Sequence, residues 1–299
     1  MGKKEKNISG AAFTTPLLFL CVMVLLWISE FYVKRASANG ENVFLSLCIV
    51  QIVSFFIPTI FYYQLKHRKL STSLLVSPLR VSHGVFVVFA SLLFFSGQLL
   101  LKFFLSKHLG IFAPSTSYIS FENAPVIQPI LAFCVVPAVC EEFFFRGIVL
   151  SEYRSYGLSR AIFISAVFFA FAHFSFEGLI TNFFAGLMLA FLTVVCRSVF
   201  PAMILHFANN LLDLYAGDFF EGLTKTETGT YFIIFSLALI FLVSLWRVFS
   251  RLQHIYLSYA ENPPKESLIN GNTKSTGAFR SWTLLLTLIA FLLITAISG

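Results

Sequence analysis

Two adjacent carboxylates inside an apolar stretch are the first residues whose types and spacing could do chemistry. Glu141 and Glu142 lie in the segment PAVCEEFFFRG, residues 137–147. On a helix Glu142 and Arg146 are one turn apart on the same face, whereas Glu141 points about 100° away. Glu142 therefore has a counter-ion nearby, which also fits a purely structural ion pair. Glu141 has none, and an unpaired carboxylate in an apolar environment is suited to take a proton from water as a general base.

Two later apolar segments carry histidines with polar neighbours. Phe169 and His173 are one helical turn apart in SAVFFAFAHF, and His206, Asn210 and Asp213 share one face of a helix in SVFPAMILHFANNLLDL. A histidine can orient a water molecule, and the N–H groups of histidine and asparagine can donate to a developing oxyanion. The structural alternatives are a core histidine for the first segment and a buried hydrogen-bond network for the second.

Membrane-spanning helices are the elements that must position these residues. The 299-residue chain is 58% hydrophobic and only 12% charged, with a mean hydropathy of +0.84, whereas soluble domains have about 25% charged residues. A soluble globule of this length cannot bury so much apolar surface. The apolar runs are continuous over about 20 residues, unlike the alternating strands of a β-barrel. The predicted fold is therefore an all-α, polytopic transmembrane helical bundle of about eight or nine spans. The expected spans are 12–33, 43–63, 84–104, 126–148, 160–175, 178–196, 198–215, 231–249 and 282–298.

The distribution of polar residues divides the chain into three parts, with the catalytic site expected among the central helices. The parts are N-terminal transmembrane helices at 1–125, a catalytic core at 126–215, and C-terminal transmembrane helices at 216–299 with a cytoplasmic linker at 250–281. In the core, Asn182 and Gly186 are one turn apart and small, which predicts close helix packing.

The basic residues predict the orientation in the membrane. With the N-terminus in the cytoplasm, 5 of the 21 Lys and Arg residues fall on the outer side and the other 16 on the cytoplasmic side, as the positive-inside rule requires. The five are Lys34, Arg35, Lys102, Lys107 and Lys225. The net charge of +7 is thus explained by the orientation of the protein in the membrane and does not indicate nucleic-acid binding. We predict a multi-pass integral membrane protein of a bacterial inner membrane, with lipid as its surroundings.

Three motifs in this order resemble the CAAX protease and bacteriocin-processing family, intramembrane proteases of the type-II CAAX prenyl endopeptidase kind. They are EExxxR at 141–146, FxxxH at 169–173 and HxxxN at 206–210, each inside an expected span. The resemblance covers about 126–215 and implies hydrolysis of a peptide bond within the membrane. It implies that Glu141 and His173 activate the water molecule.

The same resemblance implies that His206 and Asn210 form the oxyanion hole and that three residues support the site. The supporting residues are Glu142, Arg146 and Phe169. The family has been described as metal-dependent, in which case Glu141, His173 and His206 would be zinc ligands. The chain has no HExxH motif, the usual helical zinc-protease signature. The resemblance also implies a metal-independent glutamate mechanism, which we favour, and we expect no cofactor, with zinc as the alternative.

The substrate expected from the resemblance is a membrane-associated peptide or protein. Eukaryotic members of the family cut prenylated CAAX proteins, and prokaryotic relatives are linked to bacteriocin self-immunity and peptide maturation. Two other functions stay open: a non-catalytic membrane scaffold or immunity protein, and a transporter with a proton relay. A transporter should show paired broken helices in two halves, whereas the polar groups here occupy one block.

Overall fold

The computed structural model describes residues 3–66, 75, 83–109, 124–216, 222, 225–261 and 281–298, and all regular structure in them is helical. Several rods combine α-helical and π-helical turns. The elements are α1 (Lys3–Ala38), α2 (Val43–Gln51), η1 (Ile52–Phe56), α3 (Ile57–Lys66), α5 (Gly84–Leu109), α6 (Ile127–Pro129), η3 (Ile130–Val135), α7 (Val136–Phe144), η4 (Phe145–Leu150), α8 (Ser151–Tyr153), η5 (Arg154–Tyr156), α9 (Leu158–Phe171), α10 (Leu179–Cys196), α11 (Phe200–Tyr215), α13 (Glu227–Glu261) and α14 (Trp282–Ser298).

Each of the nine expected spans coincides with a helical rod, so the prediction of a helical membrane bundle is confirmed. Five of the described helices are long and apolar enough to cross a membrane, and α9 and α14 are shorter apolar helices. The rod from α6 to α8 carries the charged residues Glu141, Glu142 and Arg146 within its apolar sequence. Because lipid does not solvate charged groups, we expect these side chains to face the interior of the bundle.

The linker expected at 250–281 begins later than predicted. Helix α13 continues to Glu261, and residues 262–280 lie outside the described part of the chain. Tyr259 explains the extension, because its hydroxyl donates to the carbonyl of Val195 at the end of α10, at 3.0 Å. The expected span at 160–175 also ends early, at Phe171.

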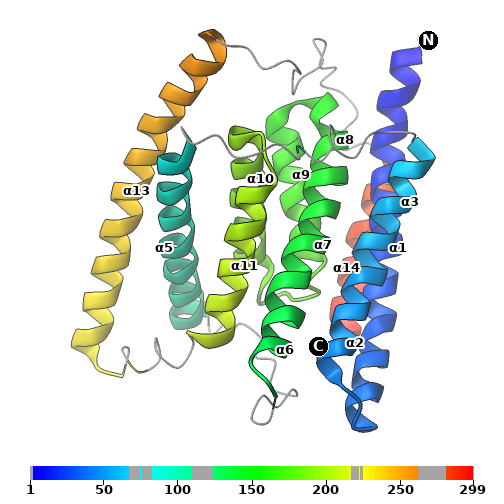
Figure 1. Cartoon of the computed structure of the whole chain (residues 1–299), viewed down its shortest axis with the longest axis horizontal. Coiled ribbons are helices and arrows are strands. Elements are labelled where there is room, and N and C mark those ends of the chain that lie inside the picture. The colour runs from blue at the N-terminus through cyan, green and yellow to red at the C-terminus, as the bar shows by residue number, and fades with distance from the viewer. Residues whose placement is uncertain are drawn as a thin grey trace.

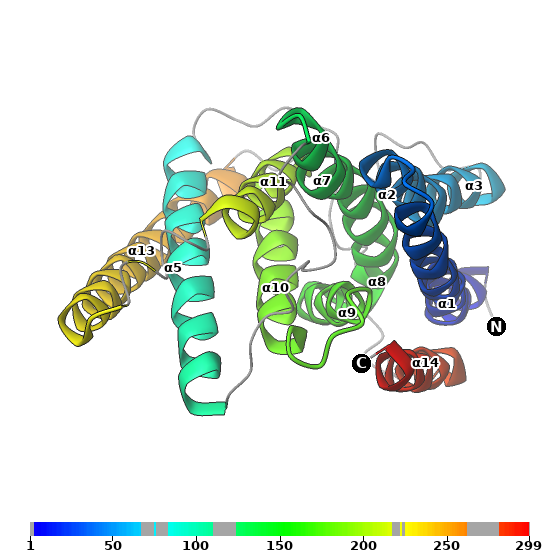
Figure 2. The ribbon, with the colours of Figure 1, turned by 90° about the horizontal axis from the view of Figure 1, so that it is seen from below.

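The central helices α7, α9, α10 and α11 are flanked by a separate pair on each side. Figure 2 shows α5 with α13 beyond α10 and α11, and α1 with α14 beyond α9. The last helix thus lies far from α13, which precedes it in the chain. It is held by a hydrogen bond from Thr283 to the carbonyl of Phe13 (3.2 Å) and by stacking of Phe291 on Phe171 (centroids 4.4 Å apart).

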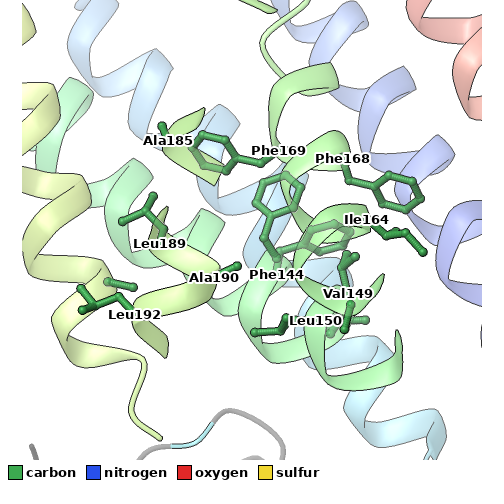
Figure 3. Packing of buried hydrophobic residues seen from close by; sticks show 14 of the residues in the cluster. Phe144, Val149, Leu150, Ile164, Phe168, Phe169, Ala185, Leu189, Ala190 and Leu192 are labelled. Carbon is green, nitrogen blue, oxygen red and sulfur yellow. The ribbon is translucent and has the colours of Figure 1, made fainter. Parts of the chain in front are cut away.

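Phenylalanine side chains make up much of the packing between the central helices. Figure 3 shows Phe144, Phe168 and Phe169 among the buried core residues, and Phe19 of α1 stacks on Phe168 with centroids 4.5 Å apart. Helix association in lipid depends on such close packing because the lipid tails are themselves apolar. Gly186 contributes in the same way: a Cβ atom added there would lie 2.8 Å from the Cα of Ala166. The packing role predicted for Gly186 is confirmed.

Candidate active site

A cavity of about 320 Å³ lies among the central helices and α2. Glu141, His173, His206 and Asn210 all line it, as the motifs predict. Their catalytic roles stay predictions. Its other lining residues are Leu47, Val50, Gln51, Phe94, Ala132, Phe133, Pro137, Phe169, Asn182, Ala185, Leu189, Asn209 and Asp213.

Glu141 lines this cavity and has one carboxylate oxygen without a hydrogen-bond partner among the described residues. The residue is only 6% exposed. Its Oε1 accepts a hydrogen bond from Nε2 of Gln51 at 3.4 Å, and its Oε2 is buried with no hydrogen-bond partner among the described residues. A buried carboxylate oxygen is almost always satisfied. We therefore expect Oε2 of Glu141 to have a partner in the functional state.

Glu142, the adjacent residue, is bound on both oxygens. Its Oε2 lies 2.9 Å from Nε of Arg146, and its Oε1 lies 3.0 Å from Nδ1 of His206. All three side chains are almost fully buried. The ion pair with Arg146, predicted from the one-turn spacing, is confirmed. The contact with His206 was not predicted, because the two residues lie 64 positions apart on different helices.

The contact with Glu142 orients the ring of His206. An ionised carboxylate only accepts hydrogen bonds, so Nδ1 of His206 is the donor. The other ring nitrogen, Nε2, is then free of this contact. The carboxylate thus acts on the imidazole as orienting carboxylates do in hydrolytic triads.

The ring of Phe169 contacts Arg146 and both histidines. The guanidinium of Arg146 lies over its ring at 5.1 Å, and the rings of His173 and His206 contact it with centroids 4.9 and 5.4 Å away. Nη1 and Nη2 of Arg146 are buried with no hydrogen-bond partner among the described residues. The cation–π contact therefore stabilises a guanidinium that Glu142 neutralises on one side only.

His173 is held at the end of α9. Its Nδ1 lies 2.8 Å from the carbonyl oxygen of Phe169, which can only accept a hydrogen bond, so Nδ1 is again the donor. In the neutral ring Nε2 then carries a lone pair. Phe174 follows with a positive φ of 44°, which ends the helix and leaves His173 exposed at the cavity wall.

Asn210 is held by a backbone carbonyl of the rod that carries the glutamate pair. This carbonyl belongs to Phe133, and Pro137, four residues later, has no N–H to donate to it. Nδ2 of Asn210 donates to that carbonyl at 2.9 Å. One N–H of the amide is thereby used, and the second is available to the cavity.

The cavity lies toward one end of the bundle. Among its lining residues, Leu47 is near the start of α2, Asn182 near the start of α10, and Asp213 near the end of α11. Figure 1 shows the starts of α2 and α6 at the end of the bundle opposite the N-terminus. Asp213, with its side chain 50% exposed, pairs there with Lys102 of α5. The cavity therefore approaches the surface on the side away from the N-terminus.

A preformed zinc site is not part of this arrangement. The described residues include no group of three His, Cys, Asp or Glu side chains placed to hold a metal ion. Glu141, His173 and His206 share the cavity but do not form such a group.

Replacing Glu142 by Gln should destabilise the protein, because Arg146 then stays buried without its counter-ion. Breaking a buried ion pair costs about 3–5 kcal/mol. We expect a clear fall in the melting temperature in detergent. Glu141→Gln is the matched control, since that carboxylate has only one long hydrogen bond, and it should leave the melting temperature nearly unchanged. Equal destabilisation by the two variants would contradict the different roles given to these carboxylates.

Comparison with known proteins agrees with the motifs. The family model that matches the chain is described as type II CAAX prenyl endopeptidase Rce1-like, and the match covers residues 123–212. No curated protein and no solved structure matches the chain. The matched residues include Glu141, Glu142, His173, His206 and Asn210. The resemblance inferred from the three motifs is thereby confirmed, and we refer to residues 123–212, which are similar to that family, as the Rce1-like segment.

Proposed function

We propose that the protein is an intramembrane endopeptidase that hydrolyses a peptide bond through a water molecule activated by Glu141 and His173. The observation that carries the proposal is the difference between two adjacent carboxylates. Glu142 has an ion-pair partner at one oxygen and His206 at the other, whereas Glu141, which lines the cavity, has one buried oxygen without a partner among the described residues. A free carboxylate next to two imidazoles and an amide is suited to general base catalysis with oxyanion stabilisation.

The proposed reaction starts with a water molecule hydrogen-bonded to Oε2 of Glu141 and Nε2 of His173. Glu141 accepts one proton, and the hydroxide oxygen forms a bond to the carbonyl carbon of the substrate. The carbonyl oxygen becomes an oxyanion, which accepts hydrogen bonds from His206 and Asn210. The C–N bond then breaks, and the proton on Glu141 passes to the leaving amine.

Charge balance explains how His206 can act as a donor. Its Nδ1 already donates to Glu142, so Nε2 donates to an oxyanion only if the ring is an imidazolium. With His206 protonated, its charge and that of Arg146 balance the two glutamates. When Glu141 takes the proton from water, the oxyanion supplies the missing negative charge. The buried group thus stays neutral throughout, which a low-dielectric site requires.

Loss of the Glu141 carboxylate should abolish cleavage. A near-isosteric amide cannot act as the base, and general base catalysis contributes about 10²–10⁴-fold. We expect Glu141→Gln to lower the cleavage rate of a membrane-associated reporter peptide by at least about 100-fold, with folded protein still recovered. Glu177→Gln, at an exposed position between α9 and α10, is the matched control and should cleave normally. Normal cleavage by Glu141→Gln would rule out this mechanism.

Chelation tests the absence of a metal from the proposed mechanism. Because Glu141 and His173 activate the water without a metal, treatment of the purified protein with a strong chelator should leave the cleavage rate unchanged. Loss of cleavage that zinc specifically restores would instead make Glu141, His173 and His206 candidate ligands. A reporter assay before and after chelation, with and without added zinc, distinguishes these outcomes.

We further propose a bacterial inner membrane as the location, with the N-terminus in the cytoplasm. The excess of Lys and Arg on the N-terminal side supports this orientation. Because the cavity approaches the opposite face, the substrate would reach Glu141 from the non-cytoplasmic side. The substrate class is then a segment that has already been translocated across the membrane.

Cysteine labelling in intact cells tests this orientation. In a chain without its native cysteines, Glu177→Cys, at the cavity end of the bundle, should react with a membrane-impermeant maleimide. Lys66→Cys, exposed at the end of α3, should react only after the membrane is permeabilised. The reverse pattern would place the cavity on the cytoplasmic side and overturn the proposed substrate class.

A further inference from the structure

Gln51 lies far outside the Rce1-like segment and yet contacts the proposed general base. It is the last residue of α2, whereas the matched segment begins at residue 123. Its side chain lines the cavity, and its Nε2 donates to Oε1 of Glu141 at 3.4 Å. A carboxylate accepts and does not donate, so the amide nitrogen must face Glu141.

The packing of the two helices holds Gln51 against Glu141. Phe55 lies one turn beyond Gln51 and is 1% exposed. Its ring contacts those of Phe144 and Phe145, each with centroids 5.7 Å away. Further along, the hydroxyl of Tyr63 donates to the carbonyl of Gly147 at 2.7 Å. These contacts fix the register of the α2–α3 rod along the rod that carries the glutamate pair.

The backbone changes its winding directly after Gln51. The π-helical segment η1 begins at Ile52, and on the other rod η4 begins at Phe145, four residues after Glu141. Single π turns within α-helices often occur at functional sites because they change the direction of the neighbouring side chains. Both partners of this hydrogen bond thus lie on α-helical turns that directly precede a π-helical segment.

The second polar atom of Gln51 has no partner. Its Oε1 is buried and makes no hydrogen bond among the described residues. Leaving such an acceptor unsatisfied costs free energy, so a donor is expected in the functional state. A peptide substrate in the cavity brings backbone N–H groups that can donate to this oxygen.

We propose that Gln51 is a positioning residue that orients Glu141 through Nε2 and receives a substrate N–H on Oε1. With its Oε1 held by Gln51, Glu141 directs its free Oε2 toward the water molecule. The amide thus connects the position of the base to the position of the peptide. This proposal rests on the endopeptidase function proposed above.

Kinetics of Gln51 variants test the role in the reaction. Gln51→Met keeps the size of the side chain but removes both polar atoms. It should lower kcat by up to about 100-fold, since a base displaced by about 1 Å can lose that much rate. Gln64→Met, at an exposed position of α3, is the matched control and should leave kcat and KM unchanged. Equal kcat for Gln51→Met and the wild type would overturn the proposal.

The pH profile separates positioning from a merely structural role. In Gln51→Glu the introduced carboxyl group can donate to Glu141 only when it is protonated. Its activity relative to the wild type should therefore rise as the pH falls. A structural defect would give the same relative activity at every pH, and that result would contradict the proposal.

An infrared measurement tests the contact without any assay of activity. The carboxyl band that Glu141→Gln removes from the spectrum belongs to Glu141. That band should shift in Gln51→Met and stay in place in Gln64→Met. An unshifted band would overturn the proposal. If the band shifts but the wild type cleaves no peptide, the endopeptidase function fails and the contact between Gln51 and Glu141 stands.

Discussion

The carboxylate of Glu142 is the group on which the rest of the site depends. It lies between Arg146 on its own helix and His206 on α11, and none of the three side chains is appreciably exposed. Without this carboxylate the apolar bundle would hold an unpaired guanidinium, which is costly in a membrane. With it, an ion pair neutralises Arg146 within the rod, and one hydrogen bond connects this rod to α11 and fixes an imidazole at the cavity wall. The ring of Phe169 contacts Arg146 and His206.

The two neighbouring glutamates have different roles because a helix separates adjacent side chains by about 100°. Glu142 points to the partners that neutralise it, and Glu141 points to the cavity, where Gln51 holds one of its oxygens. Proline contributes from the other side. Pro137 cannot donate to the carbonyl of Phe133, and that carbonyl accepts a hydrogen bond from Asn210. Glu141, His173, His206 and Asn210 thus each have one hydrogen-bond contact that orients the side chain.

The helices and the Glu142–Arg146 pair could be predicted from the sequence, because hydropathy and one-turn spacing are local signals. The contact between Glu142 and His206 could not, since it depends on how two separate helices pack and rotate. For Asn210 a signal was present: Pro137 predicts a carbonyl without its helical donor at Phe133. For Gln51 the signal was one amide within the apolar run FLSLCIVQIVSFF. Such a polar side chain in a membrane span is a candidate functional residue, as a buried charge is.

The positions of the protein's outer helices could not be predicted from local hydropathy. Hydropathy predicts that α13 ends near residue 249, but contact of Tyr259 with α10 extends it to Glu261. Nor does hydropathy say that α14 packs against α1, at the opposite side of the bundle from α13 (Figure 2). Such pairings are decided by side-chain fit between distant segments.

Nitrogen-15 spectroscopy of the protein with labelled histidine tests the central contact most directly. The signals of His206 are identified by their loss in His206→Gln. Because Nδ1 donates to Glu142, the account predicts that this nitrogen carries a proton and that its signal changes in Glu142→Gln. A His206 ring with an unprotonated Nδ1, or one whose signals are the same in Glu142→Gln, would contradict the account.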